Sequence, residues 1–154
     1  MRIVVAFGSN EGGTQGLAEM LGSELHQCGH QVDVLPANAV PDLAPYDAVL
    51  VGGALYVFRW HADARRFVAR HRAALRRRPV WLFSSGPLDD SAVKTDIPPV
   101  RFVRKTMKRI GARGHVTFGG RMLNESRRMP IGDWRDPDQV RQWAKLIDEE
   151  LRIG

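Results

Sequence analysis

Cysteine and long apolar runs are both scarce in this chain of 154 residues. The single cysteine, Cys28, excludes an internal disulfide and a zinc cluster built on several cysteines, and this usage is typical of a reducing cytoplasm. The longest apolar run, residues 48–58, contains two glycines and is too short to cross a bilayer as a helix. Residues 1–7 reach Gly8 and Ser9 too soon for a secretory signal. We therefore expect a cytoplasmic protein without a membrane span.

The remaining composition is that of an ordinary globular domain, with 44% hydrophobic and 26% charged residues. This length supports one sizeable core, so we expect a single domain over residues 1–154. The net charge is +6, from 23 Lys and Arg against 17 Asp and Glu. Such a charge indicates an acidic partner or an anionic surface, but it says nothing about the fold.

Short apolar segments alternate with amphipathic segments along the whole chain. Strands are predicted at residues 3–7, 31–35, 48–52, 80–83 and 115–118, and helices at 17–28, 61–78, 100–110 and from 137 onward. Strands joined by helical crossovers form a mostly parallel sheet with helices on both faces, so the expected fold is an α/β three-layer sandwich with a five-stranded parallel sheet. Ligands of such sheets bind beyond the carboxyl ends of the strands. The loops after the first, third and fourth strands are therefore the candidate site.

The first of these loops suits a phosphate group. It reads Gly8-Ser9-Asn10-Glu11-Gly12-Gly13-Thr14 and places backbone N–H groups, with the hydroxyls of Ser9 and Thr14, at the start of a helix. It is neither a Walker loop nor the spaced glycine motif of dinucleotide-binding folds. An ordinary helix cap at Gly13 or Thr14 is the alternative.

The other two loops suit a flat ring system. Residues 52–61 include Leu55, Tyr56 and Trp60, which would cost solubility unless something apolar covers them or they fold inward as core. Residues 84–90 add hydroxyl and backbone N–H donors that fit the polar edge of the same ring, although a generic turn would look the same.

The order of elements and the pattern Ser9-x-x-Gly12-x-Thr14 after the first strand resemble the flavodoxin family. The acid before Gly12, and Trp60 with His61 at the start of a helix, further resemble the flavodoxin-like menaquinone-dependent protoporphyrinogen oxidase group and its bacterial relatives. The resemblance covers nearly the whole chain. It implies strand order 2-1-3-4-5, bound FMN, and electron transfer as a carrier or as a small oxidoreductase acting on a quinone or a redox partner protein.

The resemblance also implies which residues bind the cofactor. They are Ser9, Asn10, Glu11, Gly12, Gly13 and Thr14 around the phosphate, Gly53, Ala54, Leu55, Tyr56 and Val57 along one side of the ring, and Ser84, Ser85, Gly86, Pro87 and Leu88 along its other edge. A carbonyl within residues 53–56 would accept a hydrogen bond from N5 of the reduced flavin. No side chain is assigned as an acid or a base, and no metal site is expected.

Three features depart from the family pattern. Glu11 stands where typical flavodoxins have a threonine, so its carboxylate must point away from a phosphate or cap a backbone N–H. The loop after the fourth strand has no tyrosine or tryptophan between Ser84 and Asp90, which weakens stacking. Residues 119–135 are short compared with the insertion of the oxidase group, which argues against porphyrinogen oxidation. The alternative function is a flavin-free binding module with the same fold.

Basic residues concentrate in two predicted helices. Residues 59–78 contain eight arginines and the single acid Asp63, and residues 101–113 contain six basic residues and no acid. In a flavodoxin-like winding both helices cover the same face of the sheet. We therefore expect one basic surface that docks an acidic partner or an anionic membrane, with a solvated face as the alternative and no nucleic acid as partner. Cys28 is expected on the buried side of the first helix.

Overall fold

The computed structural model describes residues 1–8, 13–56, 59–87, 89–122 and 132–153. The predicted site residues Ser9, Asn10, Glu11, Gly12, Val57 and Leu88 lie outside these ranges. The strands are β1 (Arg2–Gly8), β2 (Gln31–Pro36), β3 (Ala48–Tyr56), β4 (Arg59–Trp60), β5 (Val80–Ser85), β6 (Gly114–Phe118), β7 (Arg121–Met122) and β8 (Gly132–Asp133). The helices are α1 (Gly13–Gln27), α2 (Ala62–Arg70), α3 (Arg72–Arg76), α4 (Ser91–Lys94), α5 (Arg101–Ile110) and α6 (Pro137–Ile153), with a 3₁₀ turn at Ala37–Ala39.

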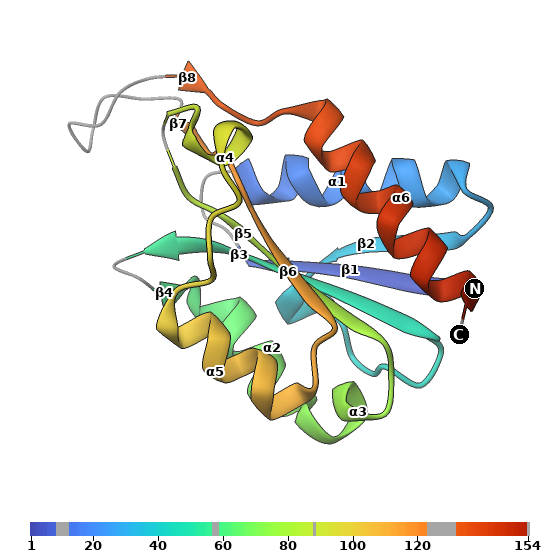
Figure 1. Ribbon diagram of the computed structural model, residues 1–154. Coiled ribbons are helices and arrows are strands. Elements are labelled where there is room, and N and C mark those ends of the chain that lie inside the picture. Colours follow the sequence, from blue (N-terminus) through green and yellow to red (C-terminus); the bar gives the residue numbers. More distant parts are fainter. Residues whose placement is uncertain (9–12, 57–58, 88, 123–131, 154) are drawn as a thin grey trace.

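The main sheet is parallel, with strand order β2-β1-β3-β5-β6 (Figure 1). This confirms the predicted α/β sandwich and the predicted order of its five main strands. The sheet has six strands rather than five, because β4 pairs antiparallel with the end of β3. The third strand was predicted to end at Gly52 and instead runs to Tyr56. Glycines allow this, since a Cβ on Gly52 would overlap the Phe83 ring and one on Gly53 would overlap Trp60.

Helices cover both faces of the sheet. In Figure 1, α1 and α6 lie on one face, and α2, α3 and α5 lie on the other. Alternate side chains of β1 lie on opposite faces of the sheet. Ile3 and Val5 pack in the core beside α1 and α6, and Val4 and Ala6 pack in the core beside α2 and α5. The two arginine-rich segments therefore share one face, as predicted. Among the described helices, none is both long enough and apolar enough to span a bilayer.

Two predicted details of the helices are wrong. Residues 61–78 were predicted as one helix, but the chain bends at His71, which separates α2 from α3. The His71 ring is buried against Phe67, with ring centroids 4.7 Å apart, and the bend brings Leu75 fully into the core. Cys28 lies just beyond α1 and is only half-buried, because the helix ends at Gln27 and Gly29 adopts a φ of +99°.

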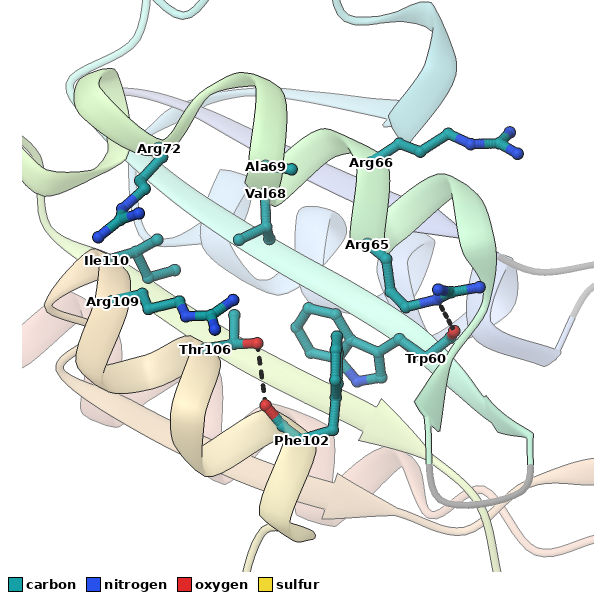
Figure 2. A pocket seen from close by; sticks show the side chains of 10 residues that line it. All are labelled: Trp60, Arg65, Arg66, Val68, Ala69, Arg72, Phe102, Thr106, Arg109 and Ile110. Atoms are coloured by element: carbon teal, nitrogen blue, oxygen red, sulfur yellow. Dashed lines mark hydrogen bonds between the residues drawn. The ribbon is translucent and has the colours of Figure 1, made fainter.

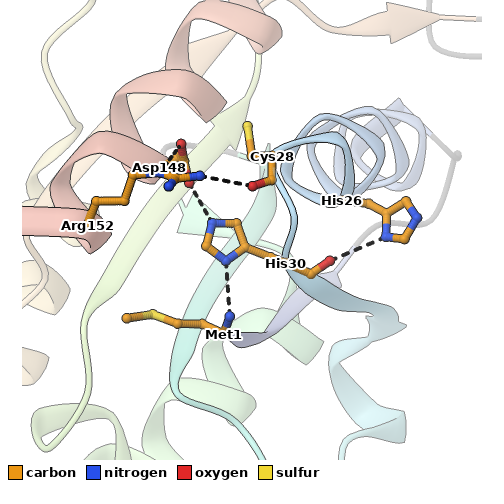
Figure 3. A network of polar contacts seen from close by, with 6 residues as sticks. All are labelled: Met1, His26, Cys28, His30, Asp148 and Arg152. Atoms are coloured by element: carbon orange, nitrogen blue, oxygen red, sulfur yellow. Dashed lines mark hydrogen bonds and ion pairs between the residues drawn. The ribbon is translucent and has the colours of Figure 1, made fainter.

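A polar network ties the end of α1 to α6 (Figure 3). The amino group of Met1 donates to Nδ1 of His30 at 3.3 Å, and Nε2 of the same ring contacts Asp148 at 2.7 Å. Asp148 also pairs with Arg152, whose guanidinium donates to the carbonyl of Cys28. Within the described ranges no group of three or more His, Cys, Asp or Glu side chains is placed to hold a metal ion.

Candidate functional site

The three predicted site loops follow strand ends that lie side by side. Gly8 of β1 pairs with Gly53 of β3, and Gly53 pairs in turn with Ser84 of β5. The next residue of the chain that the structure describes after Gly8 is Gly13, where α1 begins. We call this margin of the sheet, where β1, β3 and β5 end, the carboxyl edge. It is the place at which open α/β sheets bind ligands.

A buried hydrogen bond joins two of the predicted segments. The hydroxyls of Thr14 and Ser85 lie 2.9 Å apart, and both residues are buried. The Thr14 hydroxyl is thus engaged with the last residue of β5. The backbone N–H groups of Gly13 and Thr14 stand in the first turn of α1, where N–H groups have no partner within the helix. This arrangement leaves backbone donors for an anion at the carboxyl edge.

The predicted ring-side residues form two neighbouring walls. Residues 53–56 belong to β3 and are not a loop as predicted; of Tyr56 only the backbone is described. Gly86 lies against them, since a Cβ there would come within 3.1 Å of Leu55. Backbone bonds hold this second wall to the end of β6: Gly86 donates to Phe118, and Gly120 donates to Pro87 at 2.8 Å. The carbonyl of Ala54 already accepts a hydrogen bond from the backbone N–H of His61.

Trp60 lies in β4 and is part of the core, which is the alternative that the sequence left open for the apolar side chains of residues 52–61. It is 1% exposed, and its indole N–H donates to the Ser84 hydroxyl at 3.0 Å. The Ser84 oxygen also lies 3.0 Å from Nε2 of His115, so the three side chains form a chain under the sheet on the α2 and α5 side. Burial lowers the pKa of His115 to about 4, which keeps the ring neutral at neutral pH. The Ser84 side chain is therefore engaged away from the α1 side.

Arg121 is a candidate site residue that the sequence did not point to. Its backbone lies against the start of α1, since a Cβ on Gly13 would be 3.5 Å from the Arg121 nitrogen. Its Nε is buried and has no hydrogen-bond partner among the described residues. Nothing in the sequence of residues 119–135 distinguishes this arginine from the other basic residues of a connecting segment.

Arg121 lies in β7, which pairs antiparallel with β8 in a second, two-stranded sheet. Asp133 of β8 is the residue opposite Arg121. The guanidinium of Arg135 holds the Asp133 carboxylate through two hydrogen bonds of 2.8 and 2.6 Å. Hydrogen bonding from Arg135 lowers the pKa of Asp133 despite partial burial. The Arg135 guanidinium lies against Gly16 of α1 but is already paired with Asp133, so the charge that favours an anion at this end of the helix comes from the helix dipole.

The fold and the site define a class of α/β protein, the flavodoxin-like class. Its features here are a parallel sheet of this strand order, helices on both faces, and a glycine- and hydroxyl-rich segment before the first helix. A family model described as flavodoxin domain matches residues 4–127. The chain belongs to this flavodoxin domain family, as its resemblance predicted.

Among curated proteins, the chain is similar to protoporphyrinogen IX dehydrogenase (quinone) of Escherichia coli strain K12. The two are 29% identical over 86 residues, which cover 54% of this chain and 48% of that protein. The chain thus spans about half the length of the curated relatives that it matches.

Several solved structures share the fold. A flavodoxin from the domain Archaea has a TM-score of 0.71 at 16% identity, over 99% of both chains. A flavodoxin of Streptococcus pneumoniae has a TM-score of 0.66 at 16% identity, over 97% of this chain and 99% of that one. Rubredoxin oxygen:oxidoreductase of Desulfovibrio gigas has a TM-score of 0.72 at 13% identity, over 99% of this chain and 36% of that one. At these identities the likeness shows the fold alone.

Proposed function

We propose that this member of the flavodoxin family, as one domain, binds FMN at the carboxyl edge and passes electrons to or from a quinone or a redox partner protein. The observation that carries the proposal is the Thr14–Ser85 hydrogen bond, 2.9 Å long and buried. It joins the start of α1, which suits a phosphate, to the last residue of β5, which directly precedes Gly86 and Pro87 of the proposed ring wall.

The residues present at the carboxyl edge fit FMN. The N–H groups of Gly13 and Thr14 lie in the first turn of α1, and Arg121 offers a buried Nε that lacks a partner within the described part of the chain. Leu55 and Gly86 are in contact distance of each other and offer apolar surface beside polar backbone. A phosphate held by backbone N–H groups and a ring held by apolar walls are the two requirements of this cofactor.

Each segment has a distinct part in holding the cofactor. Gly13 and Thr14, with Ser9, Asn10 and Gly12 from the sequence, would hold the phosphate, and residues 53–56 with Gly86 and Pro87 would flank the ring. The Ala54 carbonyl already accepts a hydrogen bond from the backbone N–H of His61. We therefore expect another carbonyl of residues 53–56 to accept the hydrogen bond from flavin N5. Bound FMN would supply the redox chemistry, and the protein would orient it and tune its potential.

Flavin titration tests this proposal. We expect the purified protein to quench the fluorescence of added FMN. The Arg121→Gln variant should bind FMN about tenfold or more weakly, because a charge-assisted hydrogen bond is worth about 1.5–3 kcal/mol. Its affinity for riboflavin, which lacks the phosphate, should stay near that of the unaltered protein. Arg77→Gln is the matched control, since Arg77 is an exposed arginine beyond α3 and remote from α1.

Two outcomes would contradict the assignments. A protein that ignores added FMN would overturn cofactor binding and favour the flavin-free binding module. Equal losses for FMN and riboflavin in Arg121→Gln would show that this side chain supports the fold of the site and not the phosphate.

A further inference from the structure

A groove with an apolar floor runs between α2 and α5, on the side of the sheet away from α1 (Figure 2). Its volume is about 420 Å³. Its floor is lined by Trp60, Val68, Phe102 and Ile110, and of these four Phe102 is partly exposed while the other three are buried. Trp60 and Phe102 meet edge to face, with ring centroids 6.5 Å apart. The groove is therefore large enough for one or two apolar side chains of a partner.

Arginines surround this floor. In Figure 2 the side chains of Arg72 and Arg109 extend towards the groove from α3 and α5. Arg65 is anchored at the other end, where its Nε donates to the Trp60 carbonyl at 3.1 Å. Within the described residues none of these three forms an ion pair, whereas Arg66 pairs with Asp63 and points away from the groove. Three guanidinium groups without a carboxylate thus border an apolar surface.

We propose that this groove docks an acidic protein segment that carries an apolar side chain between carboxylates. Guanidinium groups pair with carboxylates through two parallel hydrogen bonds, so Arg72 and Arg109 can receive acids on either side of the floor. The apolar side chain of the segment packs on Phe102 and Ala69, the apolar lining residues that are not buried, and the carboxylates pair with the arginines around them.

The shape and extent of the surface favour a protein over other anionic partners. The arginines border a recessed floor, which the headgroups of a flat bilayer do not fill. Trp60 is 1% exposed and offers no open platform on which nucleic-acid bases stack. Further exposed basic residues lie on the same helices beyond the groove, namely Arg70, Arg76, Arg101, Arg104, Lys105 and Lys108. A charged face wider than the groove fits the footprint of a protein and not that of a small ligand.

The groove adjoins the carboxyl edge through one side chain. Trp60 forms part of the floor, pairs with Leu55 in the β3–β4 hairpin, and donates to Ser84. A segment seated in the groove therefore lies against the hairpin that carries the proposed ring contacts. If FMN is bound as proposed above, the docked protein is the electron donor or acceptor. The role of the docked protein in electron transfer rests on the proposed function, but docking itself does not.

Peptide binding tests the docking site. The probe is a fluorescent synthetic peptide in which glutamate pairs flank a leucine and a phenylalanine, and the comparison peptide has serine at both apolar positions. Binding is measured by fluorescence anisotropy with and without FMN, at low and at physiological salt. The groove variant is Arg72→Glu with Arg109→Glu. The matched control is Arg70→Glu with Arg104→Glu, which makes the same charge change at exposed residues that do not line the groove.

We expect the groove variant to bind the leucine-containing peptide at least about tenfold more weakly, and the control variant to lose less than about threefold, because the control alters only the general field. Binding should weaken as salt shortens the screening length from about 30 Å at 0.01 M to about 8 Å at 0.15 M. The serine peptide should bind more weakly than the leucine peptide, and FMN should not be required.

Other results overturn the proposal. Equal losses in the two variants would show a diffuse charge effect, and equal binding of the two peptides would show that the floor has no part. Tighter groove-dependent binding to phosphatidylserine vesicles or to a DNA duplex than to the peptide would assign the face to a membrane or to nucleic acid. Circular dichroism checks folding, and the milder Arg72→Gln with Arg109→Gln replaces the groove variant if charge reversal unfolds it. A protein that binds the peptide but no flavin would refute only the proposed function.

Discussion

The hydrogen bond between Thr14 and Ser85 can be tested by a double-mutant cycle. Thr14→Val keeps the shape of the side chain and removes its hydroxyl, and Ser85→Ala removes the other hydroxyl. The two oxygens are 2.9 Å apart, and relative exposures of 0% and 7% leave almost no water to replace a lost partner. Each single variant therefore leaves one hydroxyl buried without this bond.

The expected magnitudes follow from that burial. Each single variant should lower the free energy of unfolding by about 1–3 kcal/mol, because a buried polar group keeps its desolvation cost when its partner is removed. The double variant should lose less than the sum of the two, with a coupling of about 1–2 kcal/mol, since no hydroxyl is then left alone. With a urea m-value of about 1–3 kcal/mol/M, these losses shift the unfolding midpoint by about 1 M.

Urea unfolding of the flavin-free protein, followed by circular dichroism, measures the cycle without any effect of cofactor binding. Thr95→Val is the control, because Thr95 is exposed and its hydroxyl donates to the carbonyl of Ser91 four residues earlier. Its stability should change by less than about 0.5 kcal/mol. Losses of Thr14→Val and Ser85→Ala that add within about 0.5 kcal/mol would refute the interaction between the two segments. FMN titration of the same variants then shows whether the bond also prepares the cofactor site.

Two further predictions concern the side chains around Trp60. The pKa of His115 is lowered from 6.5 to about 4 by burial, so its contribution to stability is complete above about pH 6.5 and is lost as the pH falls towards 4. His115→Gln should reduce the stability that the protein loses at acidic pH, as measured by urea unfolding at neutral and at acidic pH. A variant with the same pH dependence of stability as the unaltered protein would contradict this prediction. Gly53→Ala should destabilise the protein by about 1–3 kcal/mol and shift its tryptophan fluorescence, because the added Cβ overlaps the Trp60 ring. Gly86→Ala, which meets only the end of the Leu55 side chain, should cost clearly less, and equal costs would refute the argument.

The parts of the fold that depend on local patterns were predicted from the sequence. Apolar runs separated by amphipathic segments led to the five parallel strands and the two helical layers, and the resemblance to flavodoxins implied the order of the strands. In a flavodoxin-like fold the helices α2 and α5 cover the same face of the sheet, so the shared basic face was predicted too. The meeting of the segments after β1, β3 and β5 has the same origin, since parallel strands end at one margin of the sheet.

The errors arose where neighbours distant in the sequence decide the conformation. An apolar stretch with two glycines fits a loop as well as a strand, and the pairing of residues 54–56 with β5 and β4 extends β3 to Tyr56. The break between α2 and α3 at His71 has no counterpart in the sequence pattern, since the helical spacing of apolar residues continues through it.

The sequence by itself determined the class of fold and the three segments that form the candidate site, because strand and helix periods are properties of short stretches of chain. Only the tertiary structure decided the partners of each polar group: Thr14 with Ser85, Trp60 with Ser84, and Arg121 beside the first turn of α1. It also gathered Arg65, Arg72 and Arg109 around one apolar floor. Such pairings depend on distances between residues far apart in the chain, and packing sets those distances.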